Sequence, residues 1–417
     1  MSDQKAKLHL ATSQQYLLEN ELSLFYLMLQ IKQSKIELEG ERLPLNVSFV
    51  LDRSGSMSGS KIAYTLEAVH FALSHLDQED IVSVVAFDER IELPVPATKA
   101  ENTDYLKQLL QGIDARGTTN LSGGLLEGAE QVKKGYSAER VNRVVLLTDG
   151  LANQGITDHG QLVSMVKSLS DAGISVSTLG VGEDFQEDLL VDMAEAGNGN
   201  FYFIASPDNI PDIFKEELHG LLSVTGQNPQ VTIYPADNVQ VRAVLGYEPS
   251  WGDSVTIRLP DLYNGDTKTV LAEMQALAGP AGMMPVAKVH FQYHDVANEL
   301  ARVSYDLDLS LEVTGNLEKL EKSADLKVNK EVAIFKAAQA REDAFKDADQ
   351  GDFKTSRRKL DEQTENLRSL FEQSGDEELL YQLRELENDR LYMDEQEYTP
   401  MSRKEMKARS YQSRRKR

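Results

Sequence analysis

The sequence has no cysteine in 417 residues, so it offers no disulfide, no zinc–thiolate site and no thiol nucleophile. No run approaches the roughly 18 apolar residues that a membrane-spanning helix needs, and the first residues lack the apolar core of a signal peptide. We therefore expect a cytoplasmic protein. Positive charge is scarce, since 44 Lys and Arg face 67 Asp and Glu, and the formal net charge is −23. Such a surface repels nucleic acid and anionic lipid as a whole.

The composition that remains is that of a folded protein, with 41% hydrophobic and 27% charged residues. A chain of this length has room for two or three domains. Strand-like and helical patterns alternate from residue 44 to 222, which predicts a mostly parallel, doubly wound sheet with helices on both faces. The predicted strands are 45–51, 80–87, 90–95, 142–148, 174–180 and 200–204, and the predicted helices are 60–76, 103–112, 121–134, 159–172, 186–196 and 208–222. The second and third strands are close enough for a hairpin, so we expect one antiparallel edge strand.

The flanking segments follow other patterns. Residues 1–43 hold two predicted strands, near 8–18 and 22–30, with a helix as the alternative for the second. Residues 223–315 show short β-like runs between turn residues, which predicts an antiparallel β-sandwich. Residues 316–395 have helical spacing, interrupted at residues 350–352, and predict a helical hairpin.

The last segment, residues 396–417, is basic, and its last sixteen residues hold eight Lys and Arg against Glu405. We predict a flexible tail there. The alternative is docking onto an acidic partner, or onto the acidic body of the chain itself.

The most informative stretch is the turn after the first predicted strand of the parallel sheet. Asp52, Ser54 and Ser56 stand on alternate residues there, at the end of an apolar run. In open α/β sheets ligands bind at the carboxyl ends of the strands. One carboxylate and two hydroxyls are suitable ligands for a hard divalent cation.

Two further stretches place oxygen side chains at the same predicted edge. Thr118 and Thr119 lie in a glycine-flanked loop that opens a helix, and Asp149 ends the apolar strand 142–148. With the Asp-x-Ser-x-Ser turn they resemble the von Willebrand factor type A domain, over about residues 45–220. The combined motif is specific, whereas Asp-x-Ser-x-Ser alone is not.

The resemblance implies a Rossmann-like domain with a metal-ion-dependent adhesion site. Its ligands would be Asp52, Ser54, Ser56, Thr119 and Asp149, around Mg²⁺ (or Mn²⁺ or Ca²⁺), with Thr118 as the alternative to Thr119. A partner protein would complete the coordination with an Asp or Glu side chain. The alternative is that the loop is only an element of the fold and binds no metal.

The flanks resemble, more loosely, the bacterial relatives of inter-alpha-trypsin inhibitor heavy chains, often labelled Ca-activated chloride channel-like. Those proteins place β segments around the A domain. This resemblance implies that strands before residue 44 join strands after residue 223 in one sandwich.

Catalytic motifs are absent from the sequence. The run Gly55–Lys61 resembles a phosphate-binding loop, but Ser60 stands where the motif needs glycine and Ile62 where it needs a hydroxyl. No H-E-x-x-H pair or G-x-S-x-G elbow occurs. We therefore predict a non-enzymatic, metal-dependent protein-binding module. The alternatives are an assembly or chaperone-type adaptor that works with a MoxR-type AAA+ ATPase and, more remotely, a metal-dependent hydrolase.

Overall fold

The computed structural model describes residues 6–35, 42–182, 184–298, 300–393 and 398–415. These residues form two compact units, one from the segments before residue 36 and after residue 224, the other from the segment between residues 42 and 224. Among them, no helix combines the length and the apolar character needed to cross a membrane.

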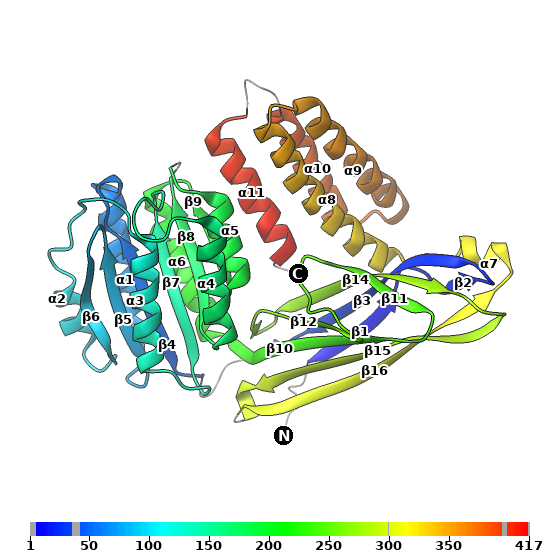
Figure 1. The fold of residues 1–417 in the computed structure, drawn as a ribbon, viewed down its shortest axis with the longest axis horizontal. Helices are drawn as coiled ribbons and strands as arrows, with labels where there is room; N and C mark the ends of the chain where they lie inside the picture. The colour runs from blue at the N-terminus through cyan, green and yellow to red at the C-terminus, as the bar shows by residue number, and fades with distance from the viewer. Residues whose placement is uncertain (1–5, 36–41, 183, 299, 394–397, 416–417) are drawn as a thin grey trace. The chain divides into compact units, whose positions relative to one another are not determined.

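The central unit is built on a six-stranded sheet in the order β6-β5-β4-β7-β8-β9 (Figure 1). All its neighbouring strands are parallel except β5 and β6, so the expected antiparallel edge strand is confirmed. The strands are β4 Leu45–Asp52, β5 Ile81–Phe87, β6 Ile91–Lys99, β7 Val141–Thr148, β8 Ser175–Val181 and β9 Asn198–Ile204.

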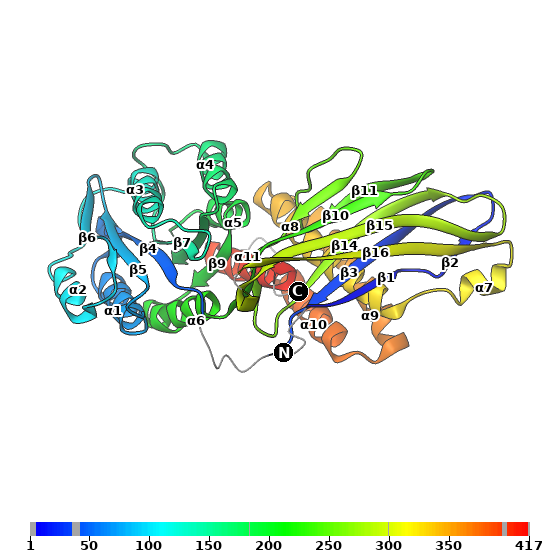
Figure 2. The ribbon, with the colours of Figure 1, turned by 90° about the horizontal axis from the view of Figure 1, so that it is seen from below.

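Helices cover both faces of this sheet, with α1, α2 and α6 on one side and α3, α4 and α5 on the other (Figure 2). Their bounds are α1 Ser60–Ser74, α2 Thr103–Leu109, α3 Leu121–Lys134, α4 His159–Asp171, α5 Glu187–Ala196 and α6 Ile210–Leu222. Because the inner strands are covered twice, every residue of β4 and β7 is buried. Burial on both faces explains why these strands are continuous apolar runs in the sequence.

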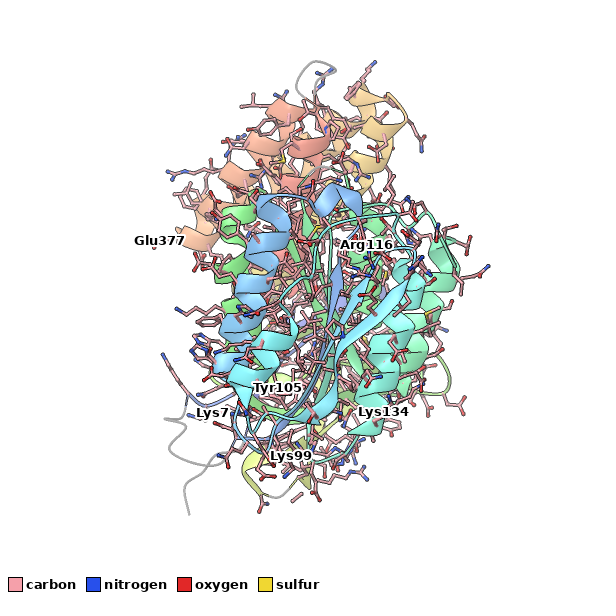
Figure 3. All side chains as sticks on the ribbon, turned by 90° about the vertical axis from the view of Figure 1, so that its left-hand side faces the viewer. Lys7, Lys99, Tyr105, Arg116, Lys134 and Glu377 are labelled. Carbon is pink, nitrogen blue, oxygen red and sulfur yellow. The ribbon has the colours of Figure 1, made fainter. Side chains whose placement is uncertain are left out.

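The parallel strands bring their carboxyl ends to one edge of the sheet. Lys99, the last residue of the antiparallel β6, pairs with Ile81 at the start of β5, so it lies at the opposite edge. Figure 3 shows Arg116 at the first edge and Lys99 and Lys134 at the other. The loops that follow β4 and β7, and the loop before α3, therefore meet at the edge marked by Arg116.

The second unit contains a sandwich of two sheets, ordered β1-β3-β14-β11 and β12-β10-β15-β16-β2, with β13 paired to β10. Strand β3 is antiparallel to β14 along its whole length, so the N-terminal strands and the strands after residue 224 form one sandwich. The helix considered for residues 22–30 is wrong, because its alternate side chains Phe25, Leu27 and Leu29 enter the core between the sheets. The strands are β1 Lys7–Thr12, β2 Tyr16–Leu18, β3 Leu22–Lys32, β10 Val224–Pro235, β11 Val239–Leu245, β12 Val255–Arg258, β13 Leu262–Tyr263, β14 Thr267–Leu277, β15 Gly282–Asp295 and β16 Ala301–Thr314.

The C-terminal segment forms helices, as predicted, but it builds more than a hairpin. Helix α8 packs against both α9 and α11, and α10 packs against α9. Met28 of β3 and Leu271 of β14 pack against Val328, Val332 and Phe335 of α8, which fixes this helix on the outer face of one sheet. The helices are α7 Leu317–Glu321, α8 Leu326–Asp349, α9 Phe353–Ser374, α10 Glu377–Tyr392 and α11 Pro400–Arg415.

The predicted flexible tail is wrong over residues 400–415, which form helix α11. One side of α11 buries Met406 and Tyr411. Its basic side chains pair with carboxylates of the same unit, where Arg403 lies 2.7 Å from Asp349 and Arg409 lies 2.8 Å from Asp389. The alternative of docking onto the chain's own acidic body therefore describes α11. Residues 396–397 and 416–417 of that prediction lie outside the described residues.

Candidate metal centre

Asp52 is the last residue of the central strand β4, and its side chain is fully buried. One carboxylate oxygen accepts the backbone N–H of Ser54 at 2.7 Å, and the other accepts the hydroxyl of Thr148 at 2.5 Å. Thr148 ends the neighbouring strand β7. The two central strands thus hold the Asp52 carboxylate in a fixed orientation at the edge of the sheet.

The turn after β4 brings the two serines beside Asp149. Residues 55–57 form one 3₁₀ turn, anchored by the buried side chain of Met57. Ser54 Oγ and Ser56 Oγ lie 3.0 Å apart, and Ser56 Oγ donates to Asp149 Oδ1 at 2.7 Å. A hydrogen-bonded chain of oxygens therefore joins the first loop of the predicted site to the third.

The loop before α3 contributes Thr119. This residue is buried, whereas Thr118 is exposed. The Thr119 backbone N–H donates to Asn153 Oδ1 at 2.9 Å, and its carbonyl accepts the N–H groups of Asn153 and Gln154. The Thr118 N–H instead donates to Glu89, outside the group of oxygens around Asp52.

The space beside Gly150 shows how closely the three loops converge. A β-carbon built on Gly150 would lie 3.1 Å from Thr119 Oγ1 and 3.7 Å from both Asp52 Oδ2 and Ser56 Oγ. One small volume beside Gly150 of the third loop is therefore surrounded by a carboxylate and a hydroxyl of the turn after β4 and a hydroxyl of the loop before α3. All five side chains of the predicted site offer oxygen, the donor that hard divalent cations prefer.

The spacing of the two serine hydroxyls also fits an octahedral ion. Metal–oxygen distances of about 2.1 Å place neighbouring ligands of an octahedron about 3.0 Å apart. The observed separation of Ser54 Oγ and Ser56 Oγ is 3.0 Å. The donor set therefore suits Mg²⁺ or a similar ion, and the same spacing allows a hydrogen bond between the hydroxyls without it.

Any metal site here needs hydroxyl groups among its ligands. No group of three or more His, Cys, Asp or Glu side chains in the described segments is arranged to hold a metal. Asp52 and Asp149 thus supply the only carboxylates of the predicted set, and neutral ligands make up the rest. The two carboxylates would balance the charge of a divalent ion, and neutral oxygens would complete its shell.

Burial shapes the electrostatics of Asp52. It raises the pKa of the carboxyl to about 6, against the hydrogen bonds from Thr148 and Ser54, while the nearby charge of Asp149 adds to the increase. The carboxylate form is thus disfavoured in the protein, and a cation beside it would restore that form.

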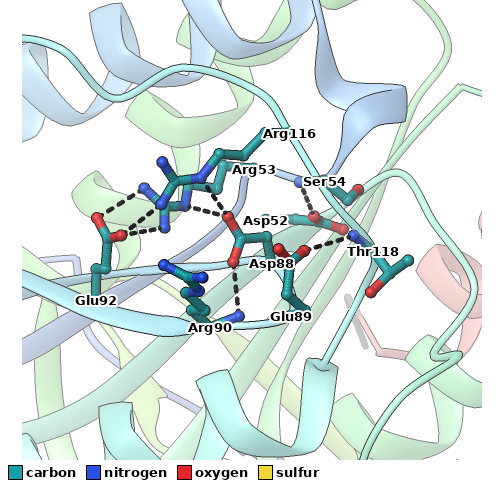
Figure 4. A network of polar contacts seen from close by, with 9 residues as sticks. All are labelled: Asp52, Arg53, Ser54, Asp88, Glu89, Arg90, Glu92, Arg116 and Thr118. Carbon is teal, nitrogen blue, oxygen red and sulfur yellow. Dashed lines mark hydrogen bonds and ion pairs between the residues drawn. The ribbon is translucent and has the colours of Figure 1, made fainter.

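A network of charged side chains supports the loop that carries Thr119 (Figure 4). Asp88 is fully buried and lies 3.0 Å from Arg53 Nε and 2.9 Å from Arg116 Nε. Both arginines also pair with Glu92. Although burial raises the pKa of Asp88, hydrogen bonds from Arg90 and Arg116 and the charge of Arg53 bring that pKa below its usual value.

Backbone contacts extend this network to the turn after β4. Arg116 N–H donates to the Arg53 carbonyl at 2.7 Å, and Gly55 N–H donates to the Gly117 carbonyl at 3.1 Å. Gly117 has φ of +70°, and a β-carbon there would lie 1.7 Å from Glu89 Oε2, so no other residue fits without rearrangement. The first two loops of the site are thereby fixed to each other.

Sequence reasoning missed Lys61 and Thr148 as neighbours of the site. Lys61, in the first turn of α1, places Nζ 2.5 Å from Asp149 Oδ2. In the sequence, Lys61 stands out only as the lysine of an incomplete phosphate-binding motif. Thr148 directly precedes Asp149, but no pattern indicated that its hydroxyl would reach Asp52.

Comparison with known proteins agrees with this architecture. The family model of the von Willebrand factor type A domain matches residues 46–216. The chain is 25% identical over 331 residues to the uncharacterized protein sll0103 of Synechocystis sp., covering 76% of this chain and 77% of that protein. It is 31% identical over 166 residues to inter-alpha-trypsin inhibitor heavy chain H1 of Sus scrofa, covering 38% of this chain but only 18% of the heavy chain.

Among solved structures, a von Willebrand factor type A protein from Catenulispora acidiphila superimposes with a TM-score of 0.73. The match covers 92% of this chain and 91% of that chain at 17% sequence identity. At this identity the likeness concerns the fold alone. It extends over both units, and the predicted fold class, an α/β domain with an accessory sandwich and a helical region, is confirmed.

Proposed function

We propose that this protein, whose residues 46–216 form a von Willebrand factor type A domain, is a non-enzymatic module that binds a partner protein through a divalent cation. Domains of this type are generally protein-interaction modules. The finer proposal is that Asp52, Ser54, Ser56, Thr119 and Asp149 hold Mg²⁺, or Mn²⁺ or Ca²⁺ in its place. A carboxylate from the partner would complete the coordination.

The observation that carries the proposal is the convergence of oxygen atoms beside Gly150. Asp52 and Ser56 come from the turn after β4 and Thr119 from the loop before α3, yet their oxygens lie within 3.7 Å of one point beside Gly150 of the third loop. Hydrophobic packing does not require such a cluster, and two of its members are nearly or fully buried. Asp52 and Asp149 bring two carboxylates close together and Lys61 supplies one ammonium beside them, so the remaining negative charge of this oxygen-rich site favours a cation.

Among the described residues, the side chains that support the site favour binding over catalysis. Thr148 and Lys61 donate to Asp52 and Asp149, and the Asn153 amide oxygen accepts the Thr119 backbone N–H. The Lys61 ammonium is already paired with Asp149, and a threonine hydroxyl is a poor proton acceptor. A divalent cation with one open coordination position would here bind an acidic side chain of a partner.

Isothermal titration calorimetry with Mg²⁺, Mn²⁺ and Ca²⁺ tests the metal site directly. We expect the wild type to bind at least one of these ions, Asp52→Ala to lose binding, and Ser58→Ala to keep it. Ser58 is the matched control, because it is an exposed serine two residues after Ser56. If the folded wild type binds none of these ions, the proposed metal site is wrong.

Affinity capture from the native host tests the proposed metal-dependent binding of a partner protein. Proteins retained in Mg²⁺ and released by EDTA should be lost with Asp52→Ala and retained with Ser58→Ala. Recovery of an AAA+ ATPase that EDTA does not release would instead support the assembly role.

A further inference from the structure

The strongest remaining observation is the ion pair between Lys61 and Asp149. Lys61 Nζ lies 2.5 Å from Asp149 Oδ2, and the other oxygen of the same carboxylate accepts the Ser56 hydroxyl at 2.7 Å. Asp149 is fully buried, while the Lys61 side chain keeps 21% of its surface exposed. Both oxygens of a proposed metal ligand are therefore satisfied by the protein itself.

This arrangement has an energetic reason. A buried carboxylate without a partner is costly, and an ammonium at contact distance offsets that cost. Lys61 reaches the carboxylate from the first turn of α1, and its ammonium lies next to the loop after β8, where a β-carbon on Gly182 would be at an ordinary contact distance of 3.6 Å from Nζ. The protein thus carries its own counter-ion beside the candidate metal centre.

We infer that Lys61 is an internal competitor of the divalent cation, which stabilises the metal-free site and lowers its affinity for metal. The inference rests on the proposed function, because it concerns the same site. A cation that uses Asp149 as a ligand must either displace the Lys61 ammonium from Oδ2 or share the carboxylate with it. In both cases the pair opposes metal binding. Lys61 also adds positive charge beside the ion, which acts in the same direction.

Three substitutions of Lys61 separate charge from packing. Lys61→Met removes the ammonium and keeps most of the apolar stem. Lys61→Gln removes the charge but keeps a hydrogen-bond donor, and so provides a second test if the methionine variant folds poorly. Lys61→Arg keeps the charge. Lys133→Met is the matched control, since it removes a half-exposed lysine of the same unit that pairs only with Glu130 on its own helix.

Calorimetric titration with Mg²⁺ or Mn²⁺ alone is the first measurement. We expect Lys61→Met and Lys61→Gln to bind about tenfold more tightly than the wild type, the worth of one charge-assisted hydrogen bond. Lys61→Arg and Lys133→Met should bind within about twofold of it, below the tenfold step of one such contact. Wild-type binding with no gain in either uncharged variant would overturn this inference and leave the proposed function standing. Absence of binding in every protein would overturn both.

Thermal unfolding gives an independent readout. In EDTA the uncharged variants should unfold at a lower temperature than the wild type, because Asp149 loses its counter-ion. Saturating Mg²⁺ should close this gap, because the ion replaces the ammonium as the partner of Asp149. A variant that is equally stable in EDTA would show that Lys61 does not hold the metal-free site, and would contradict the inference.

Discussion

Replacement of Gly150 by alanine places a methyl group among the oxygens of the candidate metal centre. The new carbon would lie 3.1 Å from Thr119 Oγ1, closer than ordinary van der Waals contact, and 3.7 Å from Asp52 Oδ2 and Ser56 Oγ. Ligands of Mg²⁺ must each approach to about 2.1 Å. The methyl group therefore occupies the space in which these three oxygens would meet an ion.

The expected effect separates metal binding from folding. The φ angle of Gly150 lies outside the left-handed region, so alanine adds no backbone strain there. Gly→Ala at such a position stabilises by about 0.4–1 kcal/mol, against which the short contact with Thr119 acts. Metal affinity should fall about 10- to 100-fold, the range seen when the surroundings of a metal ligand are disturbed.

Thermal or chemical unfolding with and without Mg²⁺ measures both quantities. An ion present at 100 times its dissociation constant stabilises by about 2.7 kcal/mol, and a 100-fold weaker site keeps only about 0.4 kcal/mol of this. Gly160→Ala is the control, because its new methyl group meets only Asp158 at an ordinary 3.6 Å. If Gly150→Ala keeps wild-type affinity, the three oxygens do not surround the ion, and the reasoning from their convergence is wrong.

Three further predictions concern pH, a buried charge and salt. The pKa of Asp52 is raised to about 6, so the protonated carboxyl stabilises the fold at low pH and this stabilisation is lost as the pH rises through that value. In EDTA, denaturant unfolding should therefore show a free energy about 1 kcal/mol lower at pH 7 than at pH 5 from this group. The opposite slope would contradict the assignment. Asp389→Ala removes the carboxylate that lies 2.7 Å from the buried Arg341, and it should lower the free energy of unfolding in urea by about 3–5 kcal/mol. Arg409→Ala should lower it clearly less, because Arg341 still neutralises Asp389. In hydrogen exchange, raising NaCl from about 0.05 to 0.5 M should increase exchange in α11 but not in α8, since salt screens the partly exposed pair of Arg403 with Asp349. Equal protection at both concentrations would show that apolar contacts alone hold α11.

The sequence was sufficient for the central unit because its signals are local. Each inner strand is an apolar run, and each of several helices begins at a side chain that caps it, such as Asn102, Asn120 and Asp158. The expected elements between residues 44 and 222 therefore agree with the observed ones to within a few residues. The edge at which the three loops meet followed from strand polarity alone.

Helix α11 could not be predicted in this way. Its apolar residues are few, and its position depends on charge pairs with residues far away in sequence, as between Arg403 and Asp349. Periodicity within a segment carries no information about such partners. A basic, polar segment therefore suggested a flexible tail, although the acidic helices that receive it were visible in composition.

The supporting contacts of the candidate site were out of reach for a similar reason. Lys61 and Asp149 are 88 residues apart in sequence, and Thr148 and Asp52 are 96 apart. Thr148 meets Asp52 because β7 pairs with β4, and Lys61 meets Asp149 because α1 begins where these two strands end, which only the folded arrangement shows. The choice of Thr119 over Thr118 came from the family resemblance, and the buried position of Thr119 is consistent with it.

The pairing of β3 with β14 also constrains how the chain acquires its structure. Lys32 pairs with Thr267, so this sheet cannot form until more than half of the chain has been synthesised. The central unit is one contiguous segment and can fold earlier. Once it has folded, its ends are held in place, so the loop between β3 and β14 is effectively shorter and costs less entropy to close. Until then, β3 exposes the apolar side chains of Phe25, Leu27, Leu29 and Ile31, which later enter the core. A fragment of residues 1–224 would keep β3 without β14 and should aggregate. A fragment of residues 42–224 lacks β3 and should remain in solution as an independent domain.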